Sequence, residues 1–197
     1  MVHSIARLPE GYEREFYVYL LDYGWKESLG EALIGNFDRM AKLASTNKAV
    51  VIRGTVGSHF EDEVLSWHHF NGQQTDELLP AILITTQHPS YFQKFAPMPR
   101  EQSAGSWANE VLLLIPLRRC CKTTDQVVEL IEKLFADIRA KKPLADFQIV
   151  QELRAGEGKS LLDALILEPS VGGFGVDLKA LGRNIRKKIN GGVFNAN

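Results

Sequence analysis

Short apolar segments alternate with amphipathic ones along most of this chain, and this alternation is the feature that most restricts its fold. Segments rich in aromatic and β-branched residues predict strands, and segments whose apolar residues recur every three or four positions predict helices. A strand, a helix and a second strand in succession are typical of a βαβ unit with a partly parallel sheet. We predict strands at residues 14–24, 48–54, 78–86 and 110–120, and helices at residues 26–45, 58–70, 123–142 and 176–189.

The third and fourth predicted strands follow each other with no helix between them. We therefore expect residues 78–86 and 110–120 to pair antiparallel, which makes the sheet mixed. The predicted fold class is α/β, with a mixed sheet flanked by helices. Residues 87–109 join the two strands and carry three prolines and little periodicity. A connection of this length in a compact domain commonly carries function.

The stretch "LRAGEGKS" resembles the end of a phosphate-binding loop. That loop has the pattern G-x-x-x-x-G-K-[ST], which would require a glycine where this chain has Leu153. Polar and apolar residues alternate in the segment before this stretch, and the segment after it carries an apolar run, and both patterns are typical of strands. We therefore predict a C-terminal β-hairpin of residues 146–153 and 160–169, joined by a glycine-bearing loop. A nucleotide site that uses Lys159 is the weaker alternative.

Composition and charge narrow the possible functions. The chain has 197 residues, of which 45% are hydrophobic and 24% charged, and this suits one globular domain. Its net charge of −1 argues against a protein that coats nucleic acid or membranes. No apolar run is long enough to span a membrane, and the first residues lack the apolar core of a signal peptide. The two cysteines are adjacent, Cys120 and Cys121, and we expect them to be reduced in a cytoplasmic protein.

One stretch near the N-terminus resembles the thioredoxin fold. In thioredoxins a strand runs into a tryptophan, a Cys-x-x-Cys motif and a long helix, and a cis-proline precedes the third core strand. In "LLDYGWKESLGEALIGNFDRMAKLA" Trp25 follows a strand at a similar place, and Pro80 opens the strand in "LLPAILIT". Lys26 and Leu29 stand where the two cysteines would fall. The resemblance therefore implies the fold without thiol–disulfide exchange, which needs a thiolate attacker and a partner thiol.

The resemblance divides the single domain, residues 1–197, into three parts. Residues 14–140 would form the thioredoxin-like core, and residues 141–189 would add the hairpin and a final helix. The polar tail 190–197 is expected to be disordered.

Polar residues at the end of the first predicted strand form the favoured binding site. Ligands in α/β sheets tend to bind beyond the carboxyl ends of parallel strands. Asp22 and Trp25 follow the first strand, Arg53 closes the second, and the segment after residue 86 follows the third. We expect these groups to converge. The alternative is that Asp22 and Arg53 form only an ion pair and that Trp25 packs on the helix.

The densest polar cluster lies in the predicted helix 58–70. Imidazoles and carboxylates bind divalent cations, and a bound cation activates water. The spacing matches no named metal motif, however, and acids are favoured in the first turn of any helix. The main expectation is that there is no metal site and no cofactor. The alternative is a divalent-cation-dependent hydrolase or nuclease that uses carboxylates such as Asp22, Glu61 and Glu63. The cluster consists of His59, Glu61, Asp62, Glu63, His68 and His69.

Two further segments suggest contacts with a partner. Tyr91, Phe92 and Phe95 lie in the long connection, and aromatic side chains in such loops serve as interface anchors. The final predicted helix is basic and amphipathic, which suits an acidic protein, nucleic acid or an anionic surface. Its basic residues include Arg183, Arg186 and Lys187.

The favoured function is a non-catalytic binding or accessory module, such as a regulatory subunit. It would act in the cytoplasm through contacts with another protein, without a cofactor. Arg118, Arg119 and Lys122 surround the cysteines. These cations would favour a reactive Cys121 thiolate, but a cysteine buried at the end of a strand is the preferred interpretation.

Overall fold

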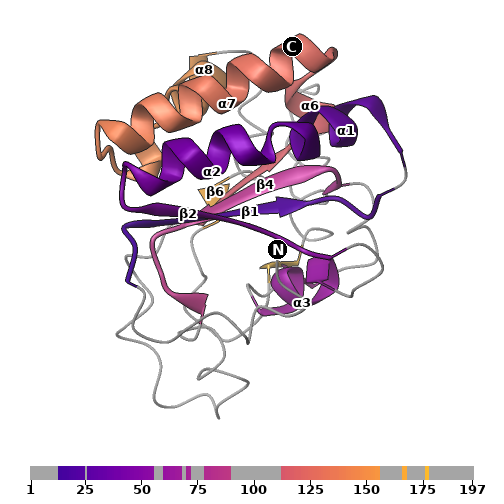
Figure 1. The fold of residues 1–197 in the computed structure, drawn as a ribbon, viewed down its shortest axis with the longest axis horizontal. Coiled ribbons are helices and arrows are strands. Elements are labelled where there is room, and N and C mark those ends of the chain that lie inside the picture. Colours follow the sequence, from indigo (N-terminus) through magenta and orange to yellow (C-terminus); the bar gives the residue numbers. More distant parts are fainter. Residues whose placement is uncertain are drawn as a thin grey trace, which may run out of the picture.

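A mixed β-sheet with four main strands, in the spatial order β2, β1, β4, β5, organises the structure (Figure 1). β1 (Phe16–Leu21) pairs with β2 (Ala49–Arg53) in parallel, whereas β4 (Ala81–Thr85) runs antiparallel to both β1 and β5 (Leu112–Pro116). A two-residue strand, β6 (Ile166–Leu167), pairs antiparallel with β5. The predicted mixed α/β sheet is confirmed, including its antiparallel third and fourth strands.

The computed structural model describes residues 13–24, 26–55, 60–67, 70–71, 78–89, 112–155, 166–167 and 176–177. Its other elements are α1 (Ser28–Gly35), α2 (Phe37–Ser45), α3 (Phe60–Trp67), β3 (Phe70–Asn71), α6 (Leu117–Cys120), α7 (Thr124–Arg139), η2 (Leu144–Asp146), α8 (Gln148–Ala155) and β7 (Val176–Asp177). β3 and β7 form a separate parallel pair. Within these ranges, no helix has the length and apolar character needed to cross a membrane.

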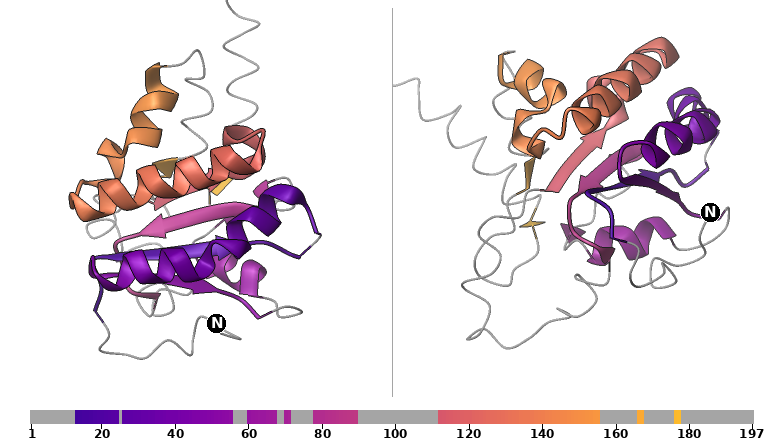
Figure 2. Two further views of the ribbon diagram at one scale, coloured as in Figure 1. Left: turned by 45° about the horizontal axis from the view of Figure 1, so that its top comes forward. Right: turned by 60° about the vertical axis from the view of Figure 1, so that its left-hand side comes forward.

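Both faces of the sheet are buried, because alternate residues of a strand point to opposite sides. Val18 and Leu20 of β1 belong to a core that includes residues of α1, α2, α7 and α8. Tyr19 and Leu21 belong to a second core, which α3 covers. Figures 1 and 2 show α1, α2 and α7 on one side of the sheet and α3 on the other. Every residue of β4 and β5 is buried, which explains their continuous apolar sequences.

The predicted helix 26–45 consists of two helices. α1 ends at Gly35 and α2 begins at Phe37, with Asn36 between them. The Asn36 side chain donates a hydrogen bond to the Ala32 carbonyl oxygen at 2.8 Å. Its backbone N–H is shared between the carbonyl oxygens of Ala32 and Leu33, both at 3.3 Å. The Asn36 side chain therefore supplies a hydrogen-bond donor for a carbonyl group at the end of α1. Short polar side chains compete in this way for backbone groups, and here the helix is interrupted.

The prediction of a strand at residues 146–153, the first of the hairpin, is wrong, because Gln148–Ala155 forms the helix α8. The polar and apolar residues in this segment only partly alternate. Ile149 and Val150 are neighbours and both are buried, which suits a helix better than a strand with one covered face. α8 packs against α7. Its conformation thus depends on a contact with α7 that the local sequence pattern does not reveal.

Two further boundaries also differ from the predictions. The fourth strand ends at Pro116, and Leu117–Cys120 forms α6 instead of extending it. Val176–Asp177 is strand β7, so the final helix does not begin at residue 176. Residues 156–165, most of the predicted helix 176–189 and the tail 190–197 lie outside the described residues.

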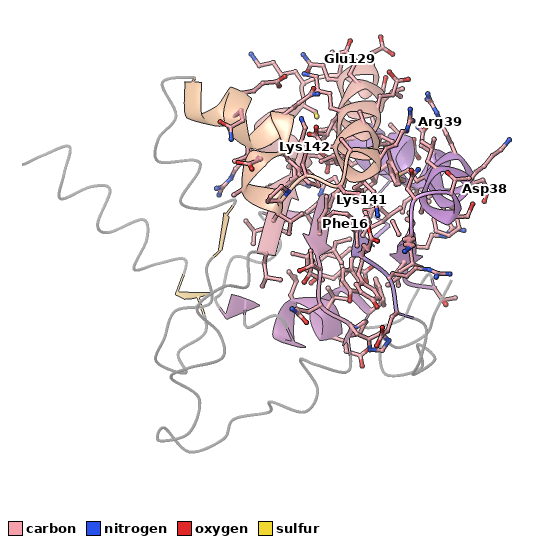
Figure 3. All side chains as sticks on the ribbon, turned by 90° about the vertical axis from the view of Figure 1, so that its left-hand side faces the viewer. Phe16, Asp38, Arg39, Glu129, Lys141 and Lys142 are labelled. Atoms are coloured by element: carbon pink, nitrogen blue, oxygen red, sulfur yellow. The ribbon has the colours of Figure 1, made fainter. Side chains whose placement is uncertain are left out.

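Asp137 ties α8 to α7 from a buried position. Its side chain is 1% exposed, and its Oδ2 accepts a hydrogen bond from the backbone N–H of Gln148 at 2.6 Å. Its Oδ1 lies 2.7 Å from Nζ of Lys142, which is labelled in Figure 3 just beyond the end of α7. The carboxylate thereby satisfies one of the N-terminal N–H groups of α8 that have no partner inside that helix.

Replacing Asp137 with alanine should lower the free energy of unfolding by about 2–3 kcal/mol, because a buried N–H then loses its charged acceptor. Asp137→Asn keeps an acceptor oxygen and should lose less. The control is Glu129→Ala, an exposed acid on the same helix (Figure 3), with an expected change within about 0.5 kcal/mol. Urea denaturation measures all three variants. Equal stabilities for Asp137→Ala and Glu129→Ala would contradict this role.

Candidate functional site

The carboxyl end of β1 gathers polar side chains from four parts of the chain, and Asp22 lies at its centre. Asp22 follows β1 directly, and its Oδ1 accepts a hydrogen bond from the backbone N–H of Gly24 at 3.1 Å. This is an Asx-type turn. Gly24 has φ +76°, a left-handed conformation that glycine adopts without a steric penalty. The turn holds the carboxylate at the strand end and directs the chain toward α1.

The Asp22 carboxylate also lies against the first turn of α1. A Cβ atom added at Gly30 would be 2.8 Å from Asp22 Oδ2 and 3.0 Å from Asp22 Cγ. Any larger residue at position 30 would therefore displace the carboxylate or the helix. Glycine normally weakens a helix interior by about 1 kcal/mol relative to alanine. Its presence here is explained by the close approach of Asp22.

Glu61 on α3 is the second carboxylate of the site, and it is buried, with only 7% of its surface exposed. Burial raises its pKa above the usual value, and the nearby charges of Asp22 and Asp62 raise it further. Hydrogen bonding with the backbone of Glu61 and of Asp22 partly opposes this rise in pKa. Asp22 and Glu61 thus form a pair of neighbouring acids in unequal environments.

A hydrogen bond between side chains adds another link between α3 and the end of β1. The Tyr23 hydroxyl donates to Asp62 Oδ1. Asp62 is exposed on the first turn of α3 and Tyr23 is half-buried. Two consecutive residues of α3, Glu61 and Asp62, therefore contact two consecutive residues that follow β1.

Arg118 is the cation of this region. Its Nε is 3.0 Å from both carboxylate oxygens of Glu27, and one terminal nitrogen is 2.6 Å from Oε2. Hydrogen bonds from Arg118 lower the pKa of Glu27. The same hydrogen bonds are the main cause of a raised pKa of Arg118, to which the charge of Asp22 adds a smaller contribution. Glu27 directly precedes α1, so this two-point ion pair connects the start of α1 to α6.

Arg118 was not predicted at this site, although the strand pairing accounts for its position. Leu21 at the end of β1 pairs with Ala81, which in turn pairs with Pro116 at the end of β5. The backbone N–H of Leu117 also donates to the Pro80 carbonyl oxygen at 2.9 Å. The antiparallel register therefore brings Arg118, two residues beyond β5, to the end of β1.

Arg53, another predicted site residue, ends β2 and pairs in register with Leu20, next to the end of β1. The contact described for Arg53 is with Phe37 of α2, whose ring centre is 4.5 Å from the guanidinium carbon. Trp25 lies outside the described residues, as do the aromatic residues Tyr91, Phe92 and Phe95 and the basic residues Arg183, Arg186 and Lys187.

The acidic cluster provides no metal centre in the described part of the chain. No group of three or more His, Cys, Asp or Glu side chains there is arranged to hold a metal ion. Asp22 and Glu61 supply two carboxylates, and His59, His68 and His69 lie outside the described residues.

The cysteines lie near this site, but their environment does not activate them. Cys121 is buried and Cys120 is half-buried. Burial raises the pKa of Cys120 to about 12; the neighbouring Cys121 also raises it, and Arg119 only partly opposes this. Burial likewise raises the pKa of Cys121, with a further contribution from Glu129. Cations surround the pair in the sequence, yet burial dominates, and neither group is a ready nucleophile.

The two glycines of α1 provide a matched test of the Asp22 contact. Gly35→Ala should raise the free energy of unfolding by about 0.5–1 kcal/mol, because nothing lies within 4 Å of its Cβ position. Gly30→Ala should raise the free energy of unfolding by less than Gly35→Ala does, or should lower it, because the added Cβ displaces the Asp22 carboxylate. In an Asp22→Ala background Gly30→Ala should recover the gain. Thermal unfolding of these variants measures the effect, and equal gains at both glycines in the wild-type background would refute the contact.

Comparison with known proteins does not assign this chain to a family. No protein-family model matches the sequence, and searches among curated proteins and among solved structures found no significant match. The residues at the end of β1 are therefore the basis for proposing a function.

Proposed function

We propose that this protein is a non-catalytic binding or accessory module on a redox-inactive, thioredoxin-like scaffold. Two observations support such a scaffold. A parallel β1–α–β2 unit is followed by the antiparallel strands β4 and β5 and the helix α7. β4 lies between β1 and β5, and Pro80 directly precedes it. Both features agree with the resemblance seen in the sequence.

We propose that the scaffold is redox-inactive because of the residues at the start of α1. Lys26 and Leu29 occupy the two positions of the Cys-x-x-Cys motif. Leu29 is buried in the core of the α1, α2 and α7 side, and Glu27 between them is paired with Arg118. Thiol–disulfide exchange needs an accessible thiolate and a second thiol. This helix start offers a charged pair and a core leucine instead.

The binding function is proposed from two sequence segments together with this scaffold. Tyr91, Phe92 and Phe95 offer large side chains of the kind that anchor protein interfaces. The basic residues Arg183, Arg186 and Lys187 favour a partner with an acidic surface. A protein partner in the cytoplasm, where both cysteines stay reduced, fits these features.

Placing a thiol pair at the start of α1 tests the scaffold. In the double variant Lys26→Cys, Leu29→Cys the two thiols should form an intramolecular disulfide under mild oxidation, because a helix N-terminus lowers the pKa of a thiol. Ellman's reagent should then count two fewer free thiols than in the reduced, unfolded double variant. The control Lys26→Cys alone should keep its thiol. Failure of a folded double variant to form the disulfide would count against a thioredoxin-like helix start.

The binding function is tested by capture of a partner from the native cytoplasm. We expect the wild-type chain to retain a specific protein, and the variant with alanine at Tyr91, Phe92 and Phe95 to lose it. Removing aromatic anchors typically weakens binding by at least about 2 kcal/mol each. The control carries alanine at Gln93 and Lys94, polar neighbours in the same segment, and should keep the partner. If no partner is captured, or if both variants behave alike, the binding function is wrong.

A further inference from the structure

The two edges of the main sheet differ. β6 pairs with β5 at one edge, whereas β2 ends the strand order at the other, and no described strand pairs with its outer side. An edge strand presents a row of backbone N–H and C=O groups, and proteins commonly protect it with proline, with charged residues inside the strand or with a bulge. β2 has the sequence AVVIR, which contains no proline and carries its only charge at its last residue. Its outer edge is therefore suited to pairing with a further strand.

The apolar side chains of β2 are committed to the two cores. Ala49 and Val51 are buried in the core on the α2 side, and Ile52 is buried in the core on the α3 side. Val50 is partly buried and packs against the core on the α3 side. A ligand at this edge therefore meets the backbone of β2 first, as it does when an extended peptide adds a strand to a sheet. The backbone of β2 thus selects an extended segment as the occupant.

Two lysines near the start of β2 indicate the charge of the occupant. Lys48 directly precedes β2, and its Nζ is 3.5 Å from Oε1 of Glu15. Lys141, labelled in Figure 3, follows α7 and places its Nζ 3.2 Å from the same oxygen. Both lysine side chains are largely exposed, at 71% and 64%. The neighbouring Glu13 and Arg14 carry opposite charges, so one carboxylate faces two accessible ammonium groups. The remaining positive charge favours an acidic group on the ligand.

The backbone at both lysines is unusual for this residue type. Lys48 has φ 49° and Lys141 has φ 52°, in the left-handed region that favours glycine. The exposed ion pairs with Glu15 contribute little stability to offset this cost. The last turns of α2 and α7 already carry Lys42 and Arg139, which suit the helix dipoles. Recognition of an external acidic group accounts for lysine at both positions, and strained residues are frequent at functional sites.

We propose that the outer edge of β2 binds an extended peptide segment of a partner protein, with an acidic residue next to Lys48 and Lys141. The segment adds a strand beside β2, and its acidic side chain displaces Glu15 from at least one of the two lysines. This surface shares no residue with the aromatic and basic segments of the proposed function. Either inference can therefore fail without the other.

A second copy of this chain is a poorer occupant of the edge than an acidic segment. Two copies of β2 in parallel bring Lys48 beside Lys48, and two antiparallel copies bring Lys48 beside Arg53, because these residues stand at the two ends of the strand. Like charges placed side by side on neighbouring strands destabilise their pairing. The basic ends of β2 thus oppose self-association and favour a strand with acidic ends.

Amide hydrogen exchange in the full chain tests this site with a defined probe. The probe is the blocked peptide Glu-Thr-Val-Thr-Val-Thr-Glu, which has an acid at each end so that it can pair in either direction. One control peptide has lysine in place of both glutamates. The other has proline in place of the central threonine, which removes a backbone N–H.

The acidic peptide, at about millimolar concentration, should slow exchange of the β2 amides at least about fivefold while α7 changes less. No slowing, or equal slowing by either control peptide, would overturn the proposal. Protection of β2 that grows with the concentration of the chain alone would assign the edge to a second copy, and would overturn it as well.

Three variants identify the charges that select the peptide. Lys48→Gly and Lys141→Gly place glycine where the backbone favours it, so both chains should stay folded but bind the acidic peptide at least about threefold more weakly. Glu15→Gln removes the competing carboxylate and should strengthen binding at least about twofold. The control Lys122→Ala, at an exposed lysine after α6, should bind as the wild type does. Unchanged binding by both glycine variants, or weaker binding by Glu15→Gln, would refute recognition of an acidic residue by these lysines.

Discussion

The burial of both faces of the sheet is the constraint on which the rest of the structure depends. β1, β4 and β5 contain no charged residue, and all of their side chains are buried. One face needs α1, α2 and α7 as cover and the other needs α3. Because the strand interiors are closed to water, the charged groups beside these strands lie at their ends. Asp22, Arg118 and Glu61 meet at one of these ends.

Local patterns predicted the elements that form this sheet, but not those that depend on tertiary contacts. The apolar runs of β1, β2, β4 and β5 were recognisable because strands buried on both faces are continuously apolar. α8 was missed because its N-terminus is satisfied by Asp137, a residue of another helix. The break at Asn36 was missed because the apolar periodicity continues across it. In both cases a side-chain hydrogen bond decided the structure.

The candidate site shows the same division. Asp22 was predicted from the rule that polar residues gather beyond the ends of strands. Arg118 was not assigned to it, because its position depends on the antiparallel register of β4 and β5. Glu61 was combined with Asp22 only in the alternative hydrolase hypothesis, because the sequence does not reveal how α3 packs. Arg53 was expected near Asp22 because it also ends a strand, and its described contact is with Phe37 of α2, on the same side of the sheet as α1 and Asp22.

Two departures from the most stable choice of residue fall at the end of β1. Gly30 weakens α1 so that the Asp22 carboxylate can lie against it, and Glu61 is an acid in a position that an apolar or amide side chain would fill without ionisation. Each of these residues lowers the stability of the folded protein, because another residue type would suit the helix or the core better at that position. Such conflicts tend to gather at functional sites. Both departures here involve the same carboxylate, which makes Asp22 and its neighbours the first place to look for this protein's activity.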